Sequence, residues 1–377
     1  MLECQRDLFT LRDDVHYLNC ASKSPLLRAS EEASMRGLMS QRLPEGTPPA
    51  DYFAEPDRLR ELFAQLIHCD PVRVAIAPSV SYGLSIATHN LRLRPDQNVV
   101  VVEDEFPSIV YASLAANNTS GGQLRTVPRE STGSAWTGRL IEAIDTATGL
   151  VSLSPVHWMY GTRFDLQAVA DRCRETGTLL VIDGTQYVGA VPFDFAQVQP
   201  DLLVVASYKW LFGPYQLGLA VVGDRLLDGV PFEHHWSPRA GSEDTSNLIY
   251  EPRYREGARR FDVGEFNNPI TVPSLNAGLE QVLAWTPAAI QEYCGALANR
   301  LMQQLDDSRY SLPPAEDRYA HILGISLKDP GRIVSVVQAL SARNVRVSKR
   351  GPVLRVSPHV YNTTDDIDAL AKVLNAN

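Results

Sequence analysis

Cysteine is scarce in this sequence and its spacing follows no known pattern. The chain has five cysteines among 377 residues, and no two of them form a C-x-x-C pair. A disulfide framework or a structural zinc site needs cysteines at close, regular spacing. The pattern therefore favours free thiols in a reducing compartment, and we expect a cytoplasmic protein.

Long apolar runs and an excess of positive charge are also missing. No uninterrupted apolar run reaches the roughly 18 residues that a membrane helix needs. The first residues, MLECQRDLFTLRDD, are too polar for a secretory signal, and the formal net charge of the chain is −9. A negative chain argues against a nucleic-acid or anionic-membrane surface. These absences predict a protein that binds neither nucleic acid nor membranes.

Short apolar runs alternate with helix-like segments from residue 73 to about residue 223. The runs read VRVAIA, NVVVVEDE, GLVSLSPV, TLLVID, DLLVVAS and LGLAVV. Strands of nearly continuous Val, Ile and Leu with helices between them indicate an α/β fold with a mostly parallel sheet covered on both faces. The link at residues 184–200 is too short and proline-broken for a full helix, which predicts an irregular strand order there.

The chain changes character after residue 284. A helical run leads to the strand HILGISL, the helix GRIVSVVQALSARN, two short strands and the helix TTDDIDALAKVL. We therefore predict a large domain at residues 20–284 and a small α+β domain built from residues 1–19 and 285–377.

Two stretches without periodicity, residues 38–56 and 231–260, are predicted as extended loops. The second contains His234 and His235, but no third ligand stands at a suitable spacing, so a loop surface is preferred and no metal is expected. It also contains four arginines that are interpreted as solvated or dimer-contact charges, with recognition of a substrate's distal acid as the alternative: Arg253, Arg255, Arg259 and Arg260.

The strand DLLVVAS runs directly into a lysine, although an ammonium group is costly to bury in apolar surroundings. In an open α/β sheet, ligands bind beyond the carboxyl ends of the strands. Three of the predicted strands carry polar residues just past those ends: Asp183 on one, Ser207, Tyr208 and Lys209 on another, and Ser79, Val80 and Ser81 on the third. We expect these residues to converge on one site.

Such a site suits pyridoxal 5′-phosphate. This cofactor needs a lysine for a Schiff base and a carboxylate that keeps its pyridine nitrogen protonated, which Lys209 and Asp183 would supply. Its phosphate needs a helix N-terminus, which Val80 and Ser81 offer. A buried lysine has a lowered pKa and reacts as the neutral amine. Taken singly, Lys209 could be a surface residue and Asp183 a turn residue.

The stretch TLLVIDGTQYVGAVPFDF followed by SYKWLFGP resembles the class V family of pyridoxal-phosphate enzymes, which includes cysteine desulfurases, kynureninases, isopenicillin N epimerase-like proteins and several aminotransferases. The resemblance extends from YLNCASKSP at 17–25 to SPHVYNTTDDIDAL at 357–370. It implies fold type I, a large domain with a mostly parallel sheet plus a small α+β C-terminal domain, and a homodimer with shared active sites.

The resemblance also implies roles for single residues. Asp183 would pair with the pyridine nitrogen, Gln186 would hydrogen-bond the ring oxygen, and Lys209 would form the internal aldimine and move the substrate proton. The remaining cofactor contacts would come from Val80, Ser81, Phe106, Ser207 and Tyr208. Arg355 would clamp the α-carboxylate of the substrate, because a guanidinium binds a carboxylate with two hydrogen bonds.

The sequence departs from the family pattern at several of these positions. Phe106 stands where desulfurases carry a histidine, and Trp158 stands where an asparagine is usual, which suggests an aromatic-walled pocket. The segment RFDVGEFNNP resembles one that reaches the partner subunit's phosphate, but Glu265 replaces its threonine, so Asn267 is expected to make that contact. No cysteine follows Cys294, so the mobile thiol loop of a desulfurase is absent.

The expected function is therefore that of a pyridoxal-phosphate enzyme that acts on an amino acid through an aldimine. An aminotransferase is preferred, because the desulfurase thiol and histidine are missing. The alternatives are a Cβ–S or Cα–Cβ lyase or an amino-acid epimerase of the same family. A catalytically silent homologue that binds a partner protein is a further alternative, against which the intact Lys209, Asp183 and Gln186 argue.

Overall fold

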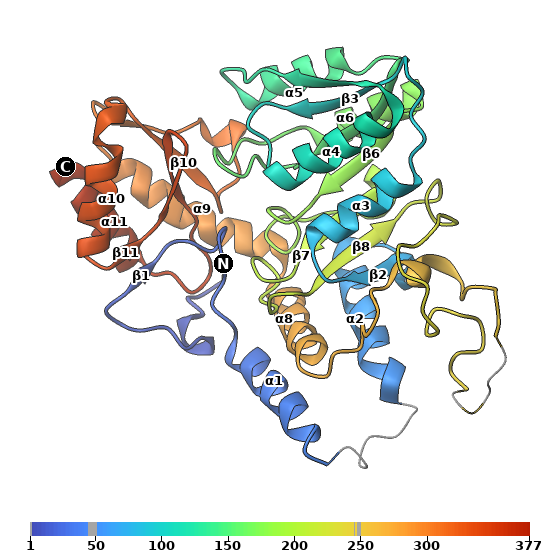
Figure 1. Cartoon of the computed structure of the whole chain (residues 1–377). Coiled ribbons are helices and arrows are strands. Elements are labelled where there is room, and N and C mark those ends of the chain that lie inside the picture. The colour runs from blue at the N-terminus through green and yellow to red at the C-terminus, as the bar shows by residue number, and fades with distance from the viewer. Residues whose placement is uncertain (1, 44–50, 245, 247–249) are drawn as a thin grey trace.

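The computed structural model describes residues 2–43, 51–244, 246 and 250–377 (Figure 1). A seven-stranded sheet lies at its centre, with the strand order β2-β8-β7-β6-β5-β3-β4. Its strands are β2 (Val74–Ala77), β3 (Asn98–Val102), β4 (Gln123–Val127), β5 (Thr148–Leu153), β6 (Leu179–Asp183), β7 (Leu202–Ala206) and β8 (Gly218–Val222).

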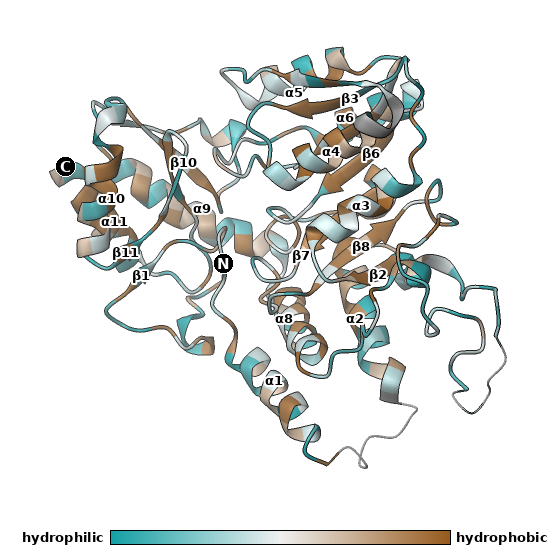
Figure 2. Cartoon of the chain, in the orientation of Figure 1, coloured by the Kyte–Doolittle hydropathy of each residue, from teal (hydrophilic) through white to brown (hydrophobic). Residues whose placement is uncertain are grey.

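The central sheet follows from the apolar runs of the sequence. Strands β2, β3, β5, β7 and β8 are buried at every residue, as the brown colouring of the sheet in Figure 2 illustrates. All neighbours pair in parallel except β8, which is antiparallel to both β7 and β2. The predicted α/β class and the mostly parallel sheet are confirmed.

The predicted irregular strand order between β6 and β7 is wrong, because these strands are direct parallel neighbours. A parallel crossover needs only about a dozen residues. The link at residues 184–200 supplies enough chain with one short helix, α7 (Phe195–Val198), whose first turn is capped by the side chain of Asp194.

Helices cover the sheet, and several of them begin or end at residues that favour helix ends. Asp165 accepts a hydrogen bond from the Ala168 amide, and Gly177 ends the same helix in the left-handed conformation at φ 72°. Strand β4, whose residues are mostly exposed or half-buried, and helix α5 were not predicted. The covering helices are α3 (Val80–Asn90), α4 (Pro107–Ser120), α5 (Gly133–Ala143), α6 (Leu166–Thr176) and α8 (Thr271–Trp285).

Among its described residues, the loop predicted at 38–56 is mostly helical, which contradicts the prediction there. Helix α1 (Arg28–Ser40) covers its start and helix α2 (Asp51–Ile67) its end, while residues 44–50 lie outside the described part. Pro56 lies inside α2. The packing of α2 against α8, which buries residues such as Phe63, outweighs the local preference of proline for a helix end. In residues 231–260, the described positions form no α-helix or strand, but the end of this predicted loop belongs to a 3-10 helix, η4 (Gly257–Phe261).

The C-terminal elements surround a four-stranded antiparallel sheet of order β12-β13-β10-β9. The N-terminal arm joins them, because β1 (His16–Tyr17) pairs in parallel with β11 (Val345–Arg346) (Figure 1). The domain limits at residues 19 and 284 remain a prediction. The remaining elements are α9 (Pro287–Gln304), β9 (Tyr310–Ser311), β10 (Leu323–Leu327), α10 (Ile333–Ala342), β12 (Ser348–Arg350), β13 (Val353–Val356) and α11 (Thr364–Ala376).

Length and hydropathy together also bear on membrane insertion. Among the helices of the described residues, none combines the length and the apolar character that crossing a bilayer requires.

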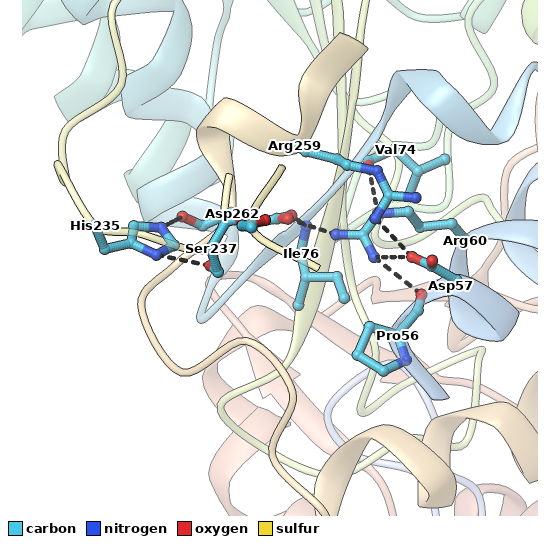
Figure 3. Close-up of polar contacts among 10 residues, drawn as sticks. Pro56, Asp57, Arg60, Val74, Ile76, His235, Ser237, Arg259 and Asp262 are labelled. Carbon is cyan, nitrogen blue, oxygen red and sulfur yellow. Dashed lines mark hydrogen bonds and ion pairs between the residues drawn. The ribbon is translucent and has the colours of Figure 1, made fainter. Parts of the chain in front are cut away.

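A buried ion pair ties helix α2 to the segment that precedes α8 (Figure 3). The guanidinium of Arg60 contacts the carboxylate of Asp262, and both side chains are at most 3% exposed. The other oxygen of Asp262 accepts the Ile76 amide of β2 at 2.8 Å. Arg259 adds a second pair to this cluster by binding Asp57 at 2.6 Å. The cluster therefore fixes the edge of the central sheet through charge as well as packing.

Asp262→Asn should lower the free energy of unfolding by about 3–5 kcal/mol, because the buried Arg60 guanidinium would lose its buried counter-charge and keep only the partly exposed Asp57 at 3.3 Å. Equilibrium urea denaturation measures this difference. Arg260→Gln is the matched control, since it breaks a pair with the 96% exposed Asp228 and should cost no more than about 1 kcal/mol. Equal effects of the two substitutions would contradict the prediction.

Candidate active site

A cavity of about 290 Å³ opens where the carboxyl ends of β2, β6 and β7 meet. This edge of the sheet is where an open α/β fold binds its ligands. Seven of the residues predicted for the site line the cavity: Val80, Ser81, Phe106, Asp183, Gln186, Tyr208 and Lys209. The structure thus brings together side chains from three strand ends, as expected.

Lys209 lies in this cavity with only 8% of its surface exposed. Its Nζ is 5.7 Å from the centre of the Phe106 ring and 5.6 Å from that of Tyr208. Burial lowers the pKa of Lys209 to about 8, with the carboxylate of Asp183 opposing this shift and the charges of Arg355 and Arg350 adding to it. A substantial fraction of the amine is therefore neutral near physiological pH, which makes it a nucleophile.

Asp183 ends strand β6 and is the acid of the cavity wall. Its Oδ1 accepts the Thr185 amide at 2.9 Å, which fixes the carboxylate. Burial raises the pKa of Asp183, while hydrogen bonds from Thr185 and the charge of Lys209 oppose that rise. A buried carboxylate of this kind gains most from a protonated partner placed beside it.

The N-terminus of helix α3 forms the wall opposite these two residues. Ser79 caps the helix by accepting the Tyr82 amide at 3.1 Å. The amides of Val80 and Ser81 are among the four that a helix cannot satisfy internally, and the helix dipole adds partial positive charge there. Together with the hydroxyls of Ser81 and Tyr208, this end of α3 suits an anionic group such as a phosphate.

Gln186 lines the cavity, and two hydrogen bonds to other residues fix the position of its side-chain amide. Its Oε1 accepts Trp210 Nε1 at 2.8 Å, and its Nε2 donates to the carbonyl of Ala21 at 3.0 Å. The side-chain amide has two N–H groups. One N–H therefore remains for a ligand, which fits the expected contact with a ring oxygen.

Aromatic side chains form a further wall, as Trp158 suggested. Phe106 and Trp158 pack edge to face with their centroids 5.5 Å apart. Beneath them lies Glu105, which was not predicted. Its carboxylate accepts the Phe106 amide and the amide and hydroxyl of Ser154, and burial raises its pKa to about 7. The only signal in the sequence was its position at the end of a strand.

Two of the predicted cofactor residues do not line this cavity. The hydroxyl of Ser207 is buried and lies within hydrogen-bond distance of the carbonyls of Pro214 and Leu217, so the side chain is turned away. Asn267 lies elsewhere, as does Glu265. A position outside the cavity of its own chain is compatible with a role at a partner's site, and that role of Asn267 remains a prediction.

The four arginines of the 231–260 loop are each paired with an acid: Arg253 with Glu251, Arg255 with Glu243, Arg259 with Asp57 and Arg260 with Asp228. His235 hydrogen-bonds the carbonyl of Asp262 and the hydroxyl of Ser237. Within the described part of the chain, no group of His, Cys, Asp and Glu side chains is arranged to hold a metal.

Arg355, on strand β13, does not line the cavity itself but contacts Trp158, which does. Its Nη1 donates to the carbonyl of Trp158 at 2.9 Å. Two glycines allow this approach, because a side chain at Gly324, which pairs with Arg355 across the small sheet, would collide with the backbone of Tyr160. A side chain at Gly161, where φ is 73°, would likewise collide with the backbone carbonyl of Ile322, which directly precedes β10.

The sequence matches a known protein family and is similar to several known proteins. The family model described as aminotransferase class-V matches residues 54–370. The chain is 24% identical to the uncharacterized aminotransferase YcbU of Bacillus subtilis, over 97% of this chain and 95% of that protein. It is 26% identical to isopenicillin N epimerase of Streptomyces clavuligerus, over 84% of this chain and 83% of that one.

The fold is also found among solved structures. C-DES, in a form with glycine covalently linked to its pyridoxal-phosphate cofactor, superposes with a TM-score of 0.87 at 20% identity, covering 98% of this chain and 99% of that one. A second structure names C-DES as a cystine C–S lyase and superposes with a TM-score of 0.85, covering 96% of this chain and 98% of that one. At this level of identity the likeness shows the fold.

The lowered pKa of Lys209 can be measured without a cofactor. Reductive methylation of the protein with formaldehyde, followed by peptide mass spectrometry, should show half-maximal reactivity of Lys209 at a pH of about 8. The neutral amine reacts, and burial disfavours the charged form, so reactivity appears at lower pH than for an ordinary lysine, whose pKa is about 10.4.

Two variants test the cause of this shift. Asp183→Asn removes the neighbouring anion and should lower the midpoint, whereas Arg355→Gln removes a neighbouring cation and should raise it. A midpoint near the ordinary lysine value, or shifts of the same sign in both variants, would contradict the electrostatic description of the cavity.

Proposed function

The chain belongs to the aminotransferase class-V family, and from that premise we propose that it is an aminotransferase acting on an amino acid. Enzymes of this family depend on pyridoxal 5′-phosphate. The observation that carries the proposal is a buried lysine with a lowered pKa, Lys209, in one cavity with Asp183 and the N-terminus of α3.

These residues fit the cofactor. When bound, pyridoxal phosphate supplies an electron sink that stabilises negative charge at the Cα of an amino acid. Lys209 would hold it covalently, and Asp183 would keep a proton on its pyridine nitrogen. Its phosphate would be bound by the amides of Val80 and Ser81 and by the Tyr208 hydroxyl. Phe106 would face the ring and exclude water from it.

Lys209 would also handle the substrate proton. Its Nζ is the basic nitrogen of the cavity, and its pKa near 8 allows it both to accept and to release a proton at neutral pH. Arg355 would bind the α-carboxylate of the substrate, because its buried guanidinium has no negatively charged partner among the described residues. Transamination would need a base that removes the proton at Cα and delivers it to the cofactor, a role that Lys209 could fill.

The residues that line the cavity include no histidine and no cysteine in the described part of the chain. This composition favours transamination, which needs no nucleophilic thiol and no second strong base. A Cβ–S lyase is the second candidate, supported by the likeness to the cystine C–S lyase C-DES over nearly the whole chain. An epimerase is supported less, by the identity to isopenicillin N epimerase.

We also propose that the protein works as a homodimer in the cytoplasm, with Asn267 serving the partner's site. Three large apolar side chains on α1 support a subunit contact, since they are exposed at 56%, 47% and 43%: Met35, Leu38 and Met39. A group of exposed apolar residues on one helix is typical of a protein interface.

A single half-reaction tests the proposed activity. Given an amino acid and no amino acceptor, the protein loaded with cofactor should yield pyridoxamine phosphate, one per active site, when it is denatured and its cofactor is analysed by chromatography. The amino group can leave the substrate only by staying on the cofactor. Lys209→Gln is the control and should show no such conversion.

The other activities give different products in the same experiment. Recovery of the aldehyde form of the cofactor together with ammonia and an oxo acid would replace the proposal by a lyase. Recovery of the aldehyde form with an inverted amino acid would replace it by an epimerase. A pyridoxyl group found by borohydride reduction on any lysine other than Lys209 would overturn the site itself.

The protein should not act as a cysteine desulfurase. Cys20 is the cysteine beside Lys209, with its Sγ 3.7 Å from the Lys209 carbonyl, but it is completely buried. Burial raises the pKa of Cys20 to about 12, so the thiol is protonated and a poor nucleophile at neutral pH. After incubation with L-cysteine, mass spectrometry should find no persulfide on any of the five cysteines.

Cys20→Ser provides the matched variant and should behave like the natural protein in this assay. Labelling of the exposed Cys4 by iodoacetamide shows that a reactive thiol would be detected. A persulfide that disappears in Cys20→Ser would contradict the prediction.

A further inference from the structure

Two arginines of the small sheet lie next to Trp158, a residue of the cavity wall, and have no counter-charge. Arg355 is 1% exposed, and Arg350, the last residue of β12, is half-buried. Among the described residues, neither guanidinium has a carboxylate oxygen within ion-pair distance. The Nε of each is buried and has no hydrogen-bond partner. Two cationic groups with unused donors in one place are a strong indication of an anion site.

The two guanidinium groups meet at one neutral oxygen. Ser22 Oγ accepts Arg355 Nη2 at 2.6 Å and Arg350 Nη2 at 3.1 Å. The same hydroxyl lies 2.9 Å from Ser348 Oγ, which donates to Asn19 at 2.7 Å. Ser22 therefore donates to Ser348 and uses both of its lone pairs on the arginines. It satisfies hydrogen bonds but neutralises no charge.

The two arginines differ in their position relative to the aromatic wall. Arg355 is anchored to the carbonyl of Trp158, whereas the guanidinium of Arg350 lies 5.9 Å from the centre of the Trp158 ring. Trp158 also lines the cavity that holds Lys209. A ligand with a short methylene chain could therefore run along the indole and present a charge at each end.

The arginines of the 231–260 loop are the other candidates for binding a carboxylate of the ligand, but their donors are already used. Of the five arginines in the 231–260 loop, four form ion pairs with acids, and the fifth, Arg239, donates to the carbonyl of Pro252 and lies over the Tyr254 ring. Both Arg350 and Arg355 add to the lowering of the pKa of Lys209, so their charges are felt inside the cavity. Binding a single carboxylate would leave one of the two positive charges uncompensated.

We propose that Arg355 and Arg350 bind two separate carboxylates, so that the amino acid substrate of this protein is dicarboxylic. Arg355 takes the α-carboxylate and Arg350 the side-chain carboxylate, with the Trp158 ring against the methylene groups between them. This inference rests on the proposed function, which makes the substrate an amino acid. It adds only how the two carboxylates of that substrate are recognised.

Dicarboxylates without an amino group test the proposal, because they bind without reacting. Isothermal titration calorimetry of the cofactor-loaded protein should show glutarate or succinate binding at least about 10-fold more tightly than the monocarboxylates of equal length, valerate and butyrate. Arg350→Gln should weaken dicarboxylate binding by about 10- to 100-fold, the range typical of hydrogen bonds to charged groups, and leave monocarboxylate binding unchanged.

Neighbouring substitutions serve as controls. Lys349→Gln removes an exposed charge beside Arg350 and should change neither affinity, because Lys349 contacts Arg350 through its backbone carbonyl. Arg350→Lys keeps the charge and should recover part of the dicarboxylate affinity. Thermal melting of each variant shows whether it is folded.

The outcomes separate this inference from the proposed function. Equal affinity for the two classes of acid, or an equal loss of both in Arg350→Gln, would overturn the inference, even with a pyridoxyl group found on Lys209 in the same samples. A dicarboxylate preference that depends on Arg350 would support it, and would do so even if no cofactor were found on Lys209, a result that would overturn the proposed function alone.

Discussion

The cost of burying positive charge is the constraint on which this active site depends. Lys209 and Asp183 line one cavity, and two further cationic side chains, Arg350 and Arg355, lie next to Trp158 of its wall, close enough for their charges to act on Lys209. In water each would be separately solvated, but within the protein their mutual repulsion and lost hydration must be relieved in other ways. Lys209 responds by giving up its proton more easily. The arginines cannot do so near neutral pH, so they retain their charge and remain able to bind anions.

The scaffold makes this arrangement possible by placing rigid elements on three sides. Strands β6 and β7 lie side by side and present Asp183 and Lys209 at the same edge. Helix α3 begins just past the end of β2 and directs its N-terminus at that edge. The small sheet closes the site, because Gly161 and Gly324 let its backbone approach the loop of Trp158 closely. Each functional group is thus fixed by backbone geometry, which is the condition for precise placement.

Sequence patterns predicted those parts of the molecule in which local chemistry and global packing agree. The apolar runs indicated six of the seven central strands, because strands buried on both faces leave a continuous Val, Ile and Leu pattern. Strand β4 lies at the sheet edge with mixed exposure and left no such pattern. Helix α2 was missed for the opposite reason, since Pro56 suggested a loop where packing against α8 stabilises a helix.

The candidate site was predicted as far as its residues follow directly from strand ends. Lys209, Asp183 and the start of α3 were found because each stands just past an apolar run. Ser207 was predicted to contact the cofactor because it is close to Lys209 in the sequence. In the structure its hydroxyl is instead within hydrogen-bond distance of the carbonyl of Pro214 in the following turn. Side-chain direction at a strand end depends on the turn that follows, and no sequence period encodes it.

Arg350 shows why the most specific features of a site are the hardest to predict. Nothing in the sequence SKRGPV distinguishes it from a solvated arginine, because the residue it meets, Ser22, lies 328 positions earlier in the chain. The pairing of β1 with β11 and the bridge between Asn19 and Ser357 hold the N-terminal arm beside the C-terminal elements and so bring the two together. The groups proposed for catalysis, Asp183 and Lys209, stand at the ends of neighbouring strands of one sheet and can be inferred locally. The groups available for substrate recognition come from both ends of the chain, so their chemistry emerges only when the fold is complete.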